Sequence, residues 1–274
     1  MNRSDVIAAS AGAGVAPTIP TPRIRTWPAL LALYFLSPGA GEVMSGSTPP
    51  LLFVQPFGFI FTPLLYGSCA ILIHEVVVRR RLGWANILLL GAAFGVFQEA
   101  LVVQTWFTFR VPASPAHADG VYGALGGINW VWALDVSIYH AIISIATPLI
   151  LLGLLFPRRA PMPWLGRKGT IALLAWLLLP CGLLAYQVAF RTFVKAGYHG
   201  PPLGAYLIAV AILLALVAIG VFVRFPTLPT RGAGESRPAP APWKVGLAAF
   251  ALMLAFFFAD IALPSTKMPA IADI

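Results

Sequence analysis

The sequence predicts an all-α, polytopic membrane protein with about seven transmembrane helices, and three observations carry this prediction. The chain has 274 residues, of which 59% are hydrophobic and only 10% charged, whereas soluble domains carry about 25% charged residues. Mean hydropathy is +0.86. The Lys and Arg residues gather at the ends of long apolar segments. The net charge of +9 therefore indicates contact with the bilayer surface and excludes a nucleic-acid partner.

The apolar segments are predicted to form one transmembrane domain over residues 26–264. Residues 1–25 are rich in Ala, Gly, Ser, Thr and Pro and have no apolar core, so they are predicted to be a disordered cytoplasmic N-terminus. The predicted spans cover residues 27–47, 51–78, 84–106, 129–156, 170–190, 203–225 and 243–263. Residues 226–242 form a Pro-rich connector that is predicted to be disordered and cytoplasmic, and residues 265–274 form a short external tail.

Two of these spans are predicted to be irregular. Ser37–Gly41 is expected to break the first span and to place Glu42 beside a protein-buried turn. Pro56 or Pro63 is expected to kink the second span. Near the end of the second span Glu75 precedes Arg79 by four residues, which predicts an ion pair on one helix face.

Lys and Arg residues set the predicted orientation, because they favour the cytoplasmic side of a membrane protein. With the N-terminus inside, fourteen lie in cytoplasmic segments and four in external ones. The cytoplasmic set is Arg3, Arg23, Arg25, Arg79, Arg80, Arg81, Arg158, Arg159, Arg167, Lys168, Arg224, Arg231, Arg237 and Lys244, and the external set is Arg110, Arg191, Lys195 and Lys267. The sequence therefore predicts a multi-pass protein of the bacterial cell (plasma) membrane, with a cytoplasmic N-terminus and an external C-terminus.

The third predicted span carries an acidic residue on a face suited to close helix packing. Gly91, Gly95 and Glu99 are spaced by four residues and share one helix face. Glycines at this spacing let another helix approach closely in lipid. A charged residue at the centre of a span costs roughly 2.5–3.5 kcal/mol on insertion scales, so intramembrane acids indicate function by default. Glu99 is therefore predicted to face a neighbouring helix within a functional site.

The fourth predicted span presents a small and polar seam to this face. Its members recur every three or four residues and are Asn129, Ala133, Ser137, His140, Ser144 and Thr147. Asp135 lies on the same span, about 140° around the helix from His140. We predict that Glu99 and His140 are catalytic partners, and that Glu42, Gln98, Asn129, Asp135 and Ser137 bind substrate or relay protons.

Depth along the spans predicts where the ionisable residues gather. At about 1.5 Å of rise per residue, Glu42, Glu99 and Asp135 lie roughly 8–10 Å below the outer surface, with His140 roughly 7 Å deeper. These residues predict an acidic cavity in the outer half of the membrane. Glu42, Glu99, Asp135 and His140 are also candidate ligands for a divalent cation, although their spacing does not identify a metal.

Part of this region resembles a known family. Gln98-Glu99, followed about forty residues later by Tyr139-His140 on the next helix, is similar over residues 95–145 to the CAAX-processing and bacteriocin-processing glutamic membrane proteases. The resemblance implies that glutamate and histidine activate water for peptide hydrolysis. The chain departs from the family pattern at three positions, where Gln98 replaces a Glu, Val103 an Arg and Val136 a Phe, and it lacks a third His-containing motif. Ser37–Glu42 and Ser45–Pro50 resemble uncharacterised bacterial membrane proteins, which implies no activity.

Three functions fit these observations. The first is a membrane-embedded hydrolase in which Glu99 is the general base and His140 a general acid or orienting partner. The second is a proton- or cation-coupled transporter, and the third a structural or assembly subunit in which the polar seam only packs. Solvent access to the seam distinguishes these functions. The lipid bilayer is the one partner that the sequence identifies; a small-molecule, lipid or peptide substrate and the oligomeric state stay open.

Overall fold

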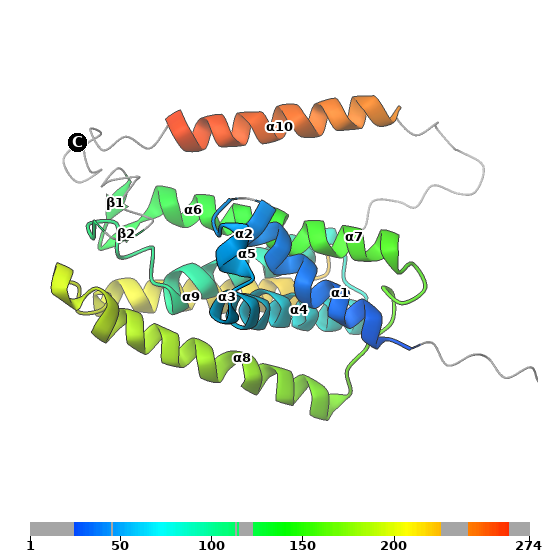
Figure 1. Ribbon diagram of the computed structural model, residues 1–274, viewed down its shortest axis with the longest axis horizontal. Coiled ribbons are helices and arrows are strands. Elements are labelled where there is room, and N and C mark those ends of the chain that lie inside the picture. Colours follow the sequence, from blue (N-terminus) through cyan, green and yellow to red (C-terminus); the bar gives the residue numbers. More distant parts are fainter. Residues whose placement is uncertain (1–24, 45, 113, 115–122, 226–240, 263–274) are drawn as a thin grey trace, which may run out of the picture.

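The computed structural model describes residues 25–44, 46–112, 114, 123–225 and 241–262. Most of the described chain is helical, and the long helices before residue 226 lie side by side in a bundle, whereas the last helix, Pro242–Ala262, lies apart from them (Figure 1). Residues 1–24, 226–240 and 263–274 lie outside the described part. The predicted N-terminal segment, connector and C-terminal tail therefore stay predictions.

The bundle contains α-helices, π-helical segments and one short β-hairpin. The elements are α1 (Trp27–Pro38), η1 (Gly39–Met44), α2 (Pro50–Phe53), α3 (Pro56–Thr62), η2 (Pro63–Gly67), α4 (Ser68–Arg80), α5 (Trp84–Val96), η3 (Phe97–Val102), β1 (Ala124–Leu125), β2 (Ile128–Asn129), α6 (Trp130–Tyr139), η5 (His140–Ala146), α7 (Thr147–Leu155), α8 (Arg167–Gln187), η6 (Val188–Thr192), η7 (Val194–Ala196), α9 (Leu203–Phe222) and α10 (Pro242–Ala262). Segments η1, η2, η3, η5 and η6 are π-helical, and η7 is a 3₁₀ turn.

Five helices of the described part are long and apolar enough to cross a membrane. They are Gly58–Arg80, Trp84–Val102, Trp130–Leu155, Arg167–Thr192 and Leu203–Phe222. They correspond to the second through sixth predicted spans, so the multi-pass membrane fold is supported. The first predicted span folds as α1 and η1, and the seventh as α10. The total of seven spans and their orientation remain predictions.

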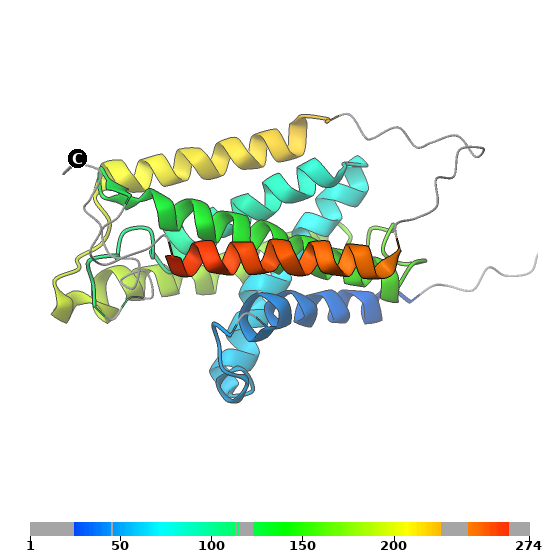
Figure 2. The same cartoon turned by 90° about the horizontal axis from the view of Figure 1, so that it is seen from above.

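The start of the chain differs from the sequence prediction. The expected break at Ser37–Gly41 is wrong, because the backbone stays helical through Gly39 and changes from α to π bonding. Pro56 begins α3, and Pro63 lies within the continuous helix Gly58–Arg80, where the bonding changes from α to π at the start of η2. In Figure 1 the turn from α1 into α2 lies part way along the bundle, and in Figure 2 α2 and α3 project sideways. The first predicted span thus turns back before it reaches the far end.

The segment between the third and fourth spans ends in a hairpin that the sequence analysis did not predict. Strands β1 and β2 pair antiparallel, with Leu125 opposite Ile128. Gly126 and Gly127 form its two-residue turn with φ of 62° and 84°, conformations that side chains with a Cβ rarely adopt. Asn129 then caps α6, because its side-chain oxygen accepts the Trp132 N–H at 3.1 Å.

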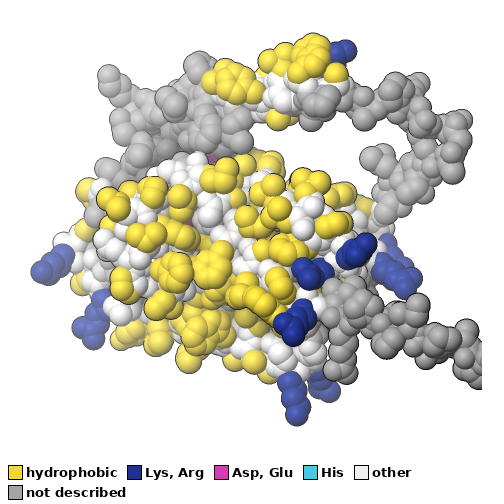
Figure 3. Space-filling view, turned by 45° about the vertical axis from the view of Figure 1, so that its right-hand side comes forward, with side chains coloured by type: hydrophobic (Ala, Val, Ile, Leu, Met, Phe, Trp, Pro, Cys, Tyr) yellow, Lys and Arg dark blue, Asp and Glu magenta, His cyan; other side chains and the backbone are white. Residues whose placement is uncertain are grey.

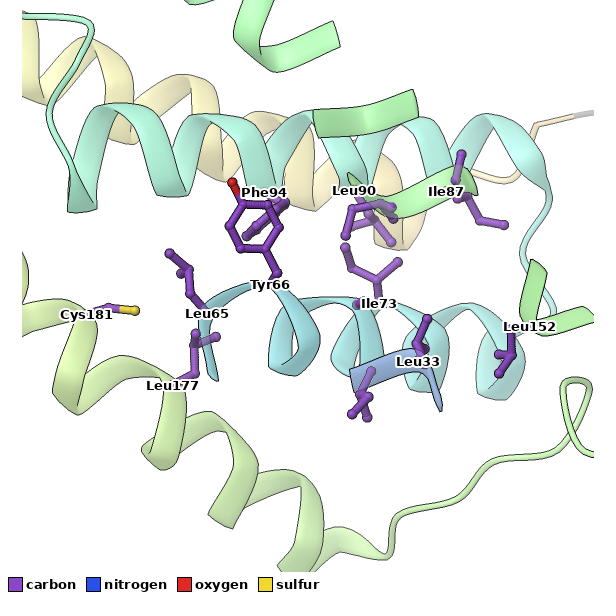
Figure 4. Close-up of a cluster of buried hydrophobic side chains, with 14 of the residues drawn as sticks. Leu33, Leu65, Tyr66, Ile73, Ile87, Leu90, Phe94, Leu152, Leu177 and Cys181 are labelled. Atoms are coloured by element: carbon purple, nitrogen blue, oxygen red, sulfur yellow. The ribbon is translucent and has the colours of Figure 1, made fainter. Parts of the chain in front are cut away.

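The second and third spans form the centre of the bundle. About 72% of the apolar window in Gly58–Arg80 and 67% of that in Trp84–Val102 is buried, against 17% for the windows in the fifth and sixth spans. Side chains from α1, α4, α5 and α7 meet in the cluster of Figure 4, where Tyr66 lies beside Phe94. The exposed leucines and aromatics of α8 and α9 therefore form the outer, lipid-facing side of the bundle.

Basic residues mark one end of the bundle, which we call the basic end. In Figure 3 most Lys and Arg side chains gather there, and fewer lie at the opposite end. The described basic-end set is Arg25, Arg79, Arg80, Arg81, Arg158, Arg159, Arg167, Lys168, Arg224 and Lys244, and the opposite set is Arg110, Arg191 and Lys195. This asymmetry agrees with the pattern from which the orientation was predicted.

At the basic end a buried acid fixes the loop between α7 and α8. The predicted ion pair is confirmed, because Glu75 and Arg79 lie 2.8 Å apart. The second Glu75 oxygen accepts the backbone N–H groups of Trp164 and Leu165, at 2.5 and 3.0 Å. His74 contacts the Ala160 carbonyl oxygen at 2.7 Å and stacks on Trp164. The His-Glu pair therefore has a structural role here.

Candidate functional site: a buried polar cluster

Four π-helical segments meet inside the bundle and supply its polar side chains. Segment η1 carries Glu42, η2 carries Tyr66, η3 carries Gln98 and Glu99, and η5 carries His140 and Ser144. A π-helical turn is rare, and it is found frequently at functional sites. Their coincidence around one set of buried side chains singles this region out as the candidate site.

Glu99 and His140 form the centre of the cluster, as predicted from their helix faces. Glu99 Oε1 lies 3.1 Å from His140 Nε2. The other carboxylate oxygen, Oε2, accepts a hydrogen bond from the Thr105 hydroxyl at 2.5 Å. Thr105 in turn accepts the indole N–H of Trp132 at 2.9 Å. Both oxygens of Glu99 are thus held by groups from separate parts of the chain.

The imidazole of His140 is fixed on both of its nitrogens. Nδ1 lies 2.9 Å from the Ser144 hydroxyl, one turn along η5. The rings of Phe94 and Tyr139 pack edge-on against it, with centroids at 5.2 and 5.3 Å. In a neutral imidazole one nitrogen donates and the other accepts. An ionised Glu99 only accepts, so it selects the tautomer in which Nε2 donates and Nδ1 accepts from Ser144.

A second chain of hydrogen bonds leads from Gln98 to Glu42. Gln98 Nε2 donates to the Tyr66 hydroxyl at 2.6 Å, and this hydroxyl donates to Glu42 Oε1 at 2.5 Å. Glu42 Oε2 accepts from Thr48 at 2.6 Å. In Figure 4 the Tyr66 ring extends from η2, which continues into α4, towards Phe94 on α5. Tyr66 therefore connects Glu42 to Gln98, the residue that precedes Glu99 in the chain.

Glycines allow the helices around the cluster to approach closely. A Cβ on Gly95 would lie 2.9 Å from Ser137 Cα, and one on Gly91 would lie 2.7 Å from Ala141 Cα. The predicted close-packing face of α5 is therefore present. A Cβ on Gly41 would lie 2.6 Å from the Ser144 hydroxyl, so η1 covers Ser144 directly.

Three of the predicted site residues lie outside these hydrogen-bond chains. Asn129 is the N-cap of α6. Ser137 donates to the Ala133 carbonyl oxygen on its own helix at 2.6 Å and packs against Gly95. Asp135 is half-buried on α6, and the chains described above run through other side chains. The structure thus brings Glu42, Gln98, Glu99 and His140 together and leaves these three at the periphery.

The cluster is buried at its centre and more exposed at one edge. Gln98, Glu99 and His140 are 5%, 8% and 3% exposed, whereas Glu42 is only half-buried. Across the described residues, no group of three His, Cys, Asp or Glu side chains is placed to hold a metal ion. Glu42 forms hydrogen bonds with Thr48 and Tyr66, and Glu99 with Thr105 and His140.

Tyr66 and Thr105 are the cluster members that the sequence analysis missed. A Tyr in an apolar span carries a hydroxyl that needs a buried hydrogen-bond partner. This is a weak sequence signal for a buried polar site. Thr105 follows the predicted Glu99 by six residues and reaches it only because η3 ends at Val102 and the chain turns back. No periodic pattern marks such a contact.

Comparison with known proteins supports the assignment as a membrane protein and does not identify an activity. Residues 30–272 match the model of a family described as "Uncharacterized membrane protein family". No curated protein and no solved structure matches the chain. These findings give no support to the resemblance to glutamic proteases.

Proposed function

We propose that this chain, which belongs to an uncharacterised membrane protein family over residues 30–272, is a membrane-embedded hydrolase with Glu99 and His140 as its acid–base pair. The observation that carries the proposal is the 3.1 Å contact between Glu99 Oε1 and His140 Nε2, with a hydroxyl on the far side of each group. A general base needs such fixed geometry before its pKa matters. If the polar seam only packed the helices together, neither Glu99 nor His140 would need a second hydrogen bond to fix its orientation.

The chemistry assigns a separate role to each group. Glu99 takes a proton from water as the water oxygen attacks the electrophilic carbon of the substrate. Glu99 then returns this proton to the leaving group, while His140 holds the Glu99 carboxyl group in place through Nε2–H and the Ser144 contact orients the imidazole ring. Glu42 lies at the more exposed edge, where its charge acts on the substrate through the Tyr66 hydroxyl. Access to Glu99 requires displacement of Thr105, which occupies Oε2.

Water is the nucleophile in this proposal, although Ser144, His140 and Glu99 have the contact order of a serine triad. Ser144 is fully buried. Its hydroxyl is covered by Gly41, where even a methyl group would collide at 2.6 Å. A substrate carbonyl has no room beside this hydroxyl, so Ser144 acts as a positioning residue.

The test reconstitutes the full chain in liposomes that enclose a pH-sensitive dye and supplies amide, ester and phosphoester lipids as candidate substrates. The proposal expects release of product from one class and a loss of about 10²–10⁴-fold in Glu99→Gln and His140→Gln. Asp135→Asn, on the same helix as His140 but outside the hydrogen-bond chains, is the matched control and keeps its activity. Turnover that persists in both cluster variants overturns the enzyme assignment.

A second candidate, a proton-coupled transporter, is favoured by one observation. The hydrogen bonds from half-buried Glu42 through Tyr66 to Gln98 end next to the Glu99–His140 pair, and such chains of polar side chains conduct protons in membrane proteins. The same liposomes distinguish this function. Dye response without product release, abolished by Glu99→Gln and by Tyr66→Phe, would favour transport over hydrolysis.

A further inference from the structure

A groove at the basic end runs between α1, α4 and α8, away from the polar cluster. Its volume is about 460 Å³, and its walls are apolar and aromatic. The residues that shape it are Leu31 and Tyr34 of α1, Ile71 of α4, and Ala172, Leu173 and Trp176 of α8. We infer that this groove binds an acyl chain of an anionic phospholipid whose phosphate lies against Arg167 and Lys168.

The helix face of α8 explains the hollow. Gly169, Ala172, Leu173 and Trp176 recur at three- and four-residue intervals and so line one stripe of the helix. Two of the four are small, which leaves space beside the larger side chains. Leu31 and Trp176 are 44% and 54% exposed. A flexible hydrocarbon chain fills such a shallow apolar space without presenting polar groups of its own.

The rim of the groove is cationic and only partly neutralised. Arg79 pairs with Glu75 and also donates to the carbonyl oxygen of Leu165, which itself lines the groove. Glu75 is the one described acid at this end. The ion pair of Glu75 is the one with Arg79. Arg167 and Lys168, exposed at the start of α8, therefore retain their charge beside the groove.

Charge complementarity favours a lipid over a protein helix in this groove. An apolar helix would approach Arg167 and Lys168 without an acceptor, whereas a phosphate offers several oxygens to both. Basic residues near the membrane surface attract anionic headgroups individually. The ligand chemistry is thus one acyl chain with a phosphodiester, as in phosphatidylglycerol.

The experiment titrates the purified full chain with phosphatidylglycerol or phosphatidylcholine of identical acyl chains and counts bound lipids by native mass spectrometry. We expect preferential binding of phosphatidylglycerol. Arg167→Gln and Lys168→Gln should each weaken this binding about fivefold, and together roughly thirtyfold, from the contribution of one basic residue near an anionic surface. The matched control is Arg224→Gln with Lys244→Gln, which removes equal charge at the same end on other helices.

A second pair of variants tests the apolar part of the site. Ala172→Trp fills the groove and should abolish the tight phosphatidylglycerol adduct, while Ala175→Trp places the same ring on α8 outside the lining. Equal affinity for the two lipids, or equal losses in the two pairs of charge variants, would overturn the proposal. A third outcome would also overturn it: the spectra show dimers, Ala172→Trp removes them, and lipid binding is unchanged. A second copy of the chain would then occupy the groove.

Discussion

Replacing Gly95 by Ala is the most direct test of how the cluster is held together. A Cβ at this position would lie 2.9 Å from Ser137 Cα, 3.2 Å from His140 Cβ and 3.2 Å from the Val136 carbonyl oxygen. Two of these neighbours are backbone atoms of the facing helix, so no side-chain rotation relieves the contact. The helices must separate, and His140 moves away from Glu99.

The expected magnitude follows from two opposing terms. Overpacking a closely packed contact costs about 1–3 kcal/mol, while Ala in place of Gly within a helix gains roughly 0.5–1 kcal/mol. Gly153 on α7 supplies the matched control, because a Cβ there meets nothing within 4 Å. Gly153→Ala should therefore keep only the gain, and the two variants should differ by the overpacking cost alone, about 1–3 kcal/mol in the free energy of unfolding.

Unfolding of both purified variants in mixed micelles, followed by circular dichroism, measures this difference. The reasoning predicts that Gly95→Ala unfolds at the lower denaturant concentration and Gly153→Ala at or above the wild-type value. Equal stabilities of the two variants would show that α5 and α6 do not approach as closely as the structure places them.

The remaining predictions concern single polar groups. Glu99→Gln should change the ¹⁵N chemical shifts of the His140 imidazole, because its acceptor on Nε2 loses its charge, whereas Asp135→Asn should leave them unchanged. Glu75→Gln should cost about 1.5–3 kcal/mol and accelerate tryptic cleavage of the loop between α7 and α8; an unchanged cleavage rate would contradict the anchoring role. Burial raises the pKa of the Tyr198 phenol, so its contribution to stability is present at neutral pH and lost as pH rises above about 10. Tyr198→Phe should therefore destabilise the chain at pH 7, where the hydroxyl is hydrogen-bonded, yet show a smaller alkaline decline in melting temperature.

The contact between Glu99 and His140 could be predicted because helical periodicity shows which residues share a helix face. Four-residue spacing placed Glu99 behind Gly95, and the polar seam placed His140 on the facing helix. The two spans follow each other in the chain and cross the membrane in opposite directions, which predicted them as antiparallel neighbours. In lipid, where small residues mark helix contacts, these patterns are sufficient to pair two faces. They do not reveal whether a seam is hydrated.

Other features could not be predicted, because they depend on depth, tilt and backbone irregularity. The depth argument treated each span as an upright helix, yet α1 turns into α2 part way along the bundle (Figure 1). Glu42 reaches the cluster nonetheless, by way of Tyr66. Asp135, like Glu99, is an acidic residue within an apolar span, but it lies on another side of its helix. The change from α to π bonding has no simple residue signature.

The π-helical segments make the alignment of the site depend on chain length. One extra residue per turn shifts everything downstream by roughly 100° around the helix axis relative to an uninterrupted α-helix. Closure of η3 into regular α bonding with its number of residues unchanged would rotate Glu99 away from His140 with every side chain conserved, whereas deletion of one residue within η3 would remove the extra residue of the π turn and largely keep the register of the residues that follow. An insertion or deletion in α5 or α6 that no π turn absorbs would separate Glu99 from His140 even in a relative that keeps both residues, so changes in the length of these helices carry functional information as well as substitutions.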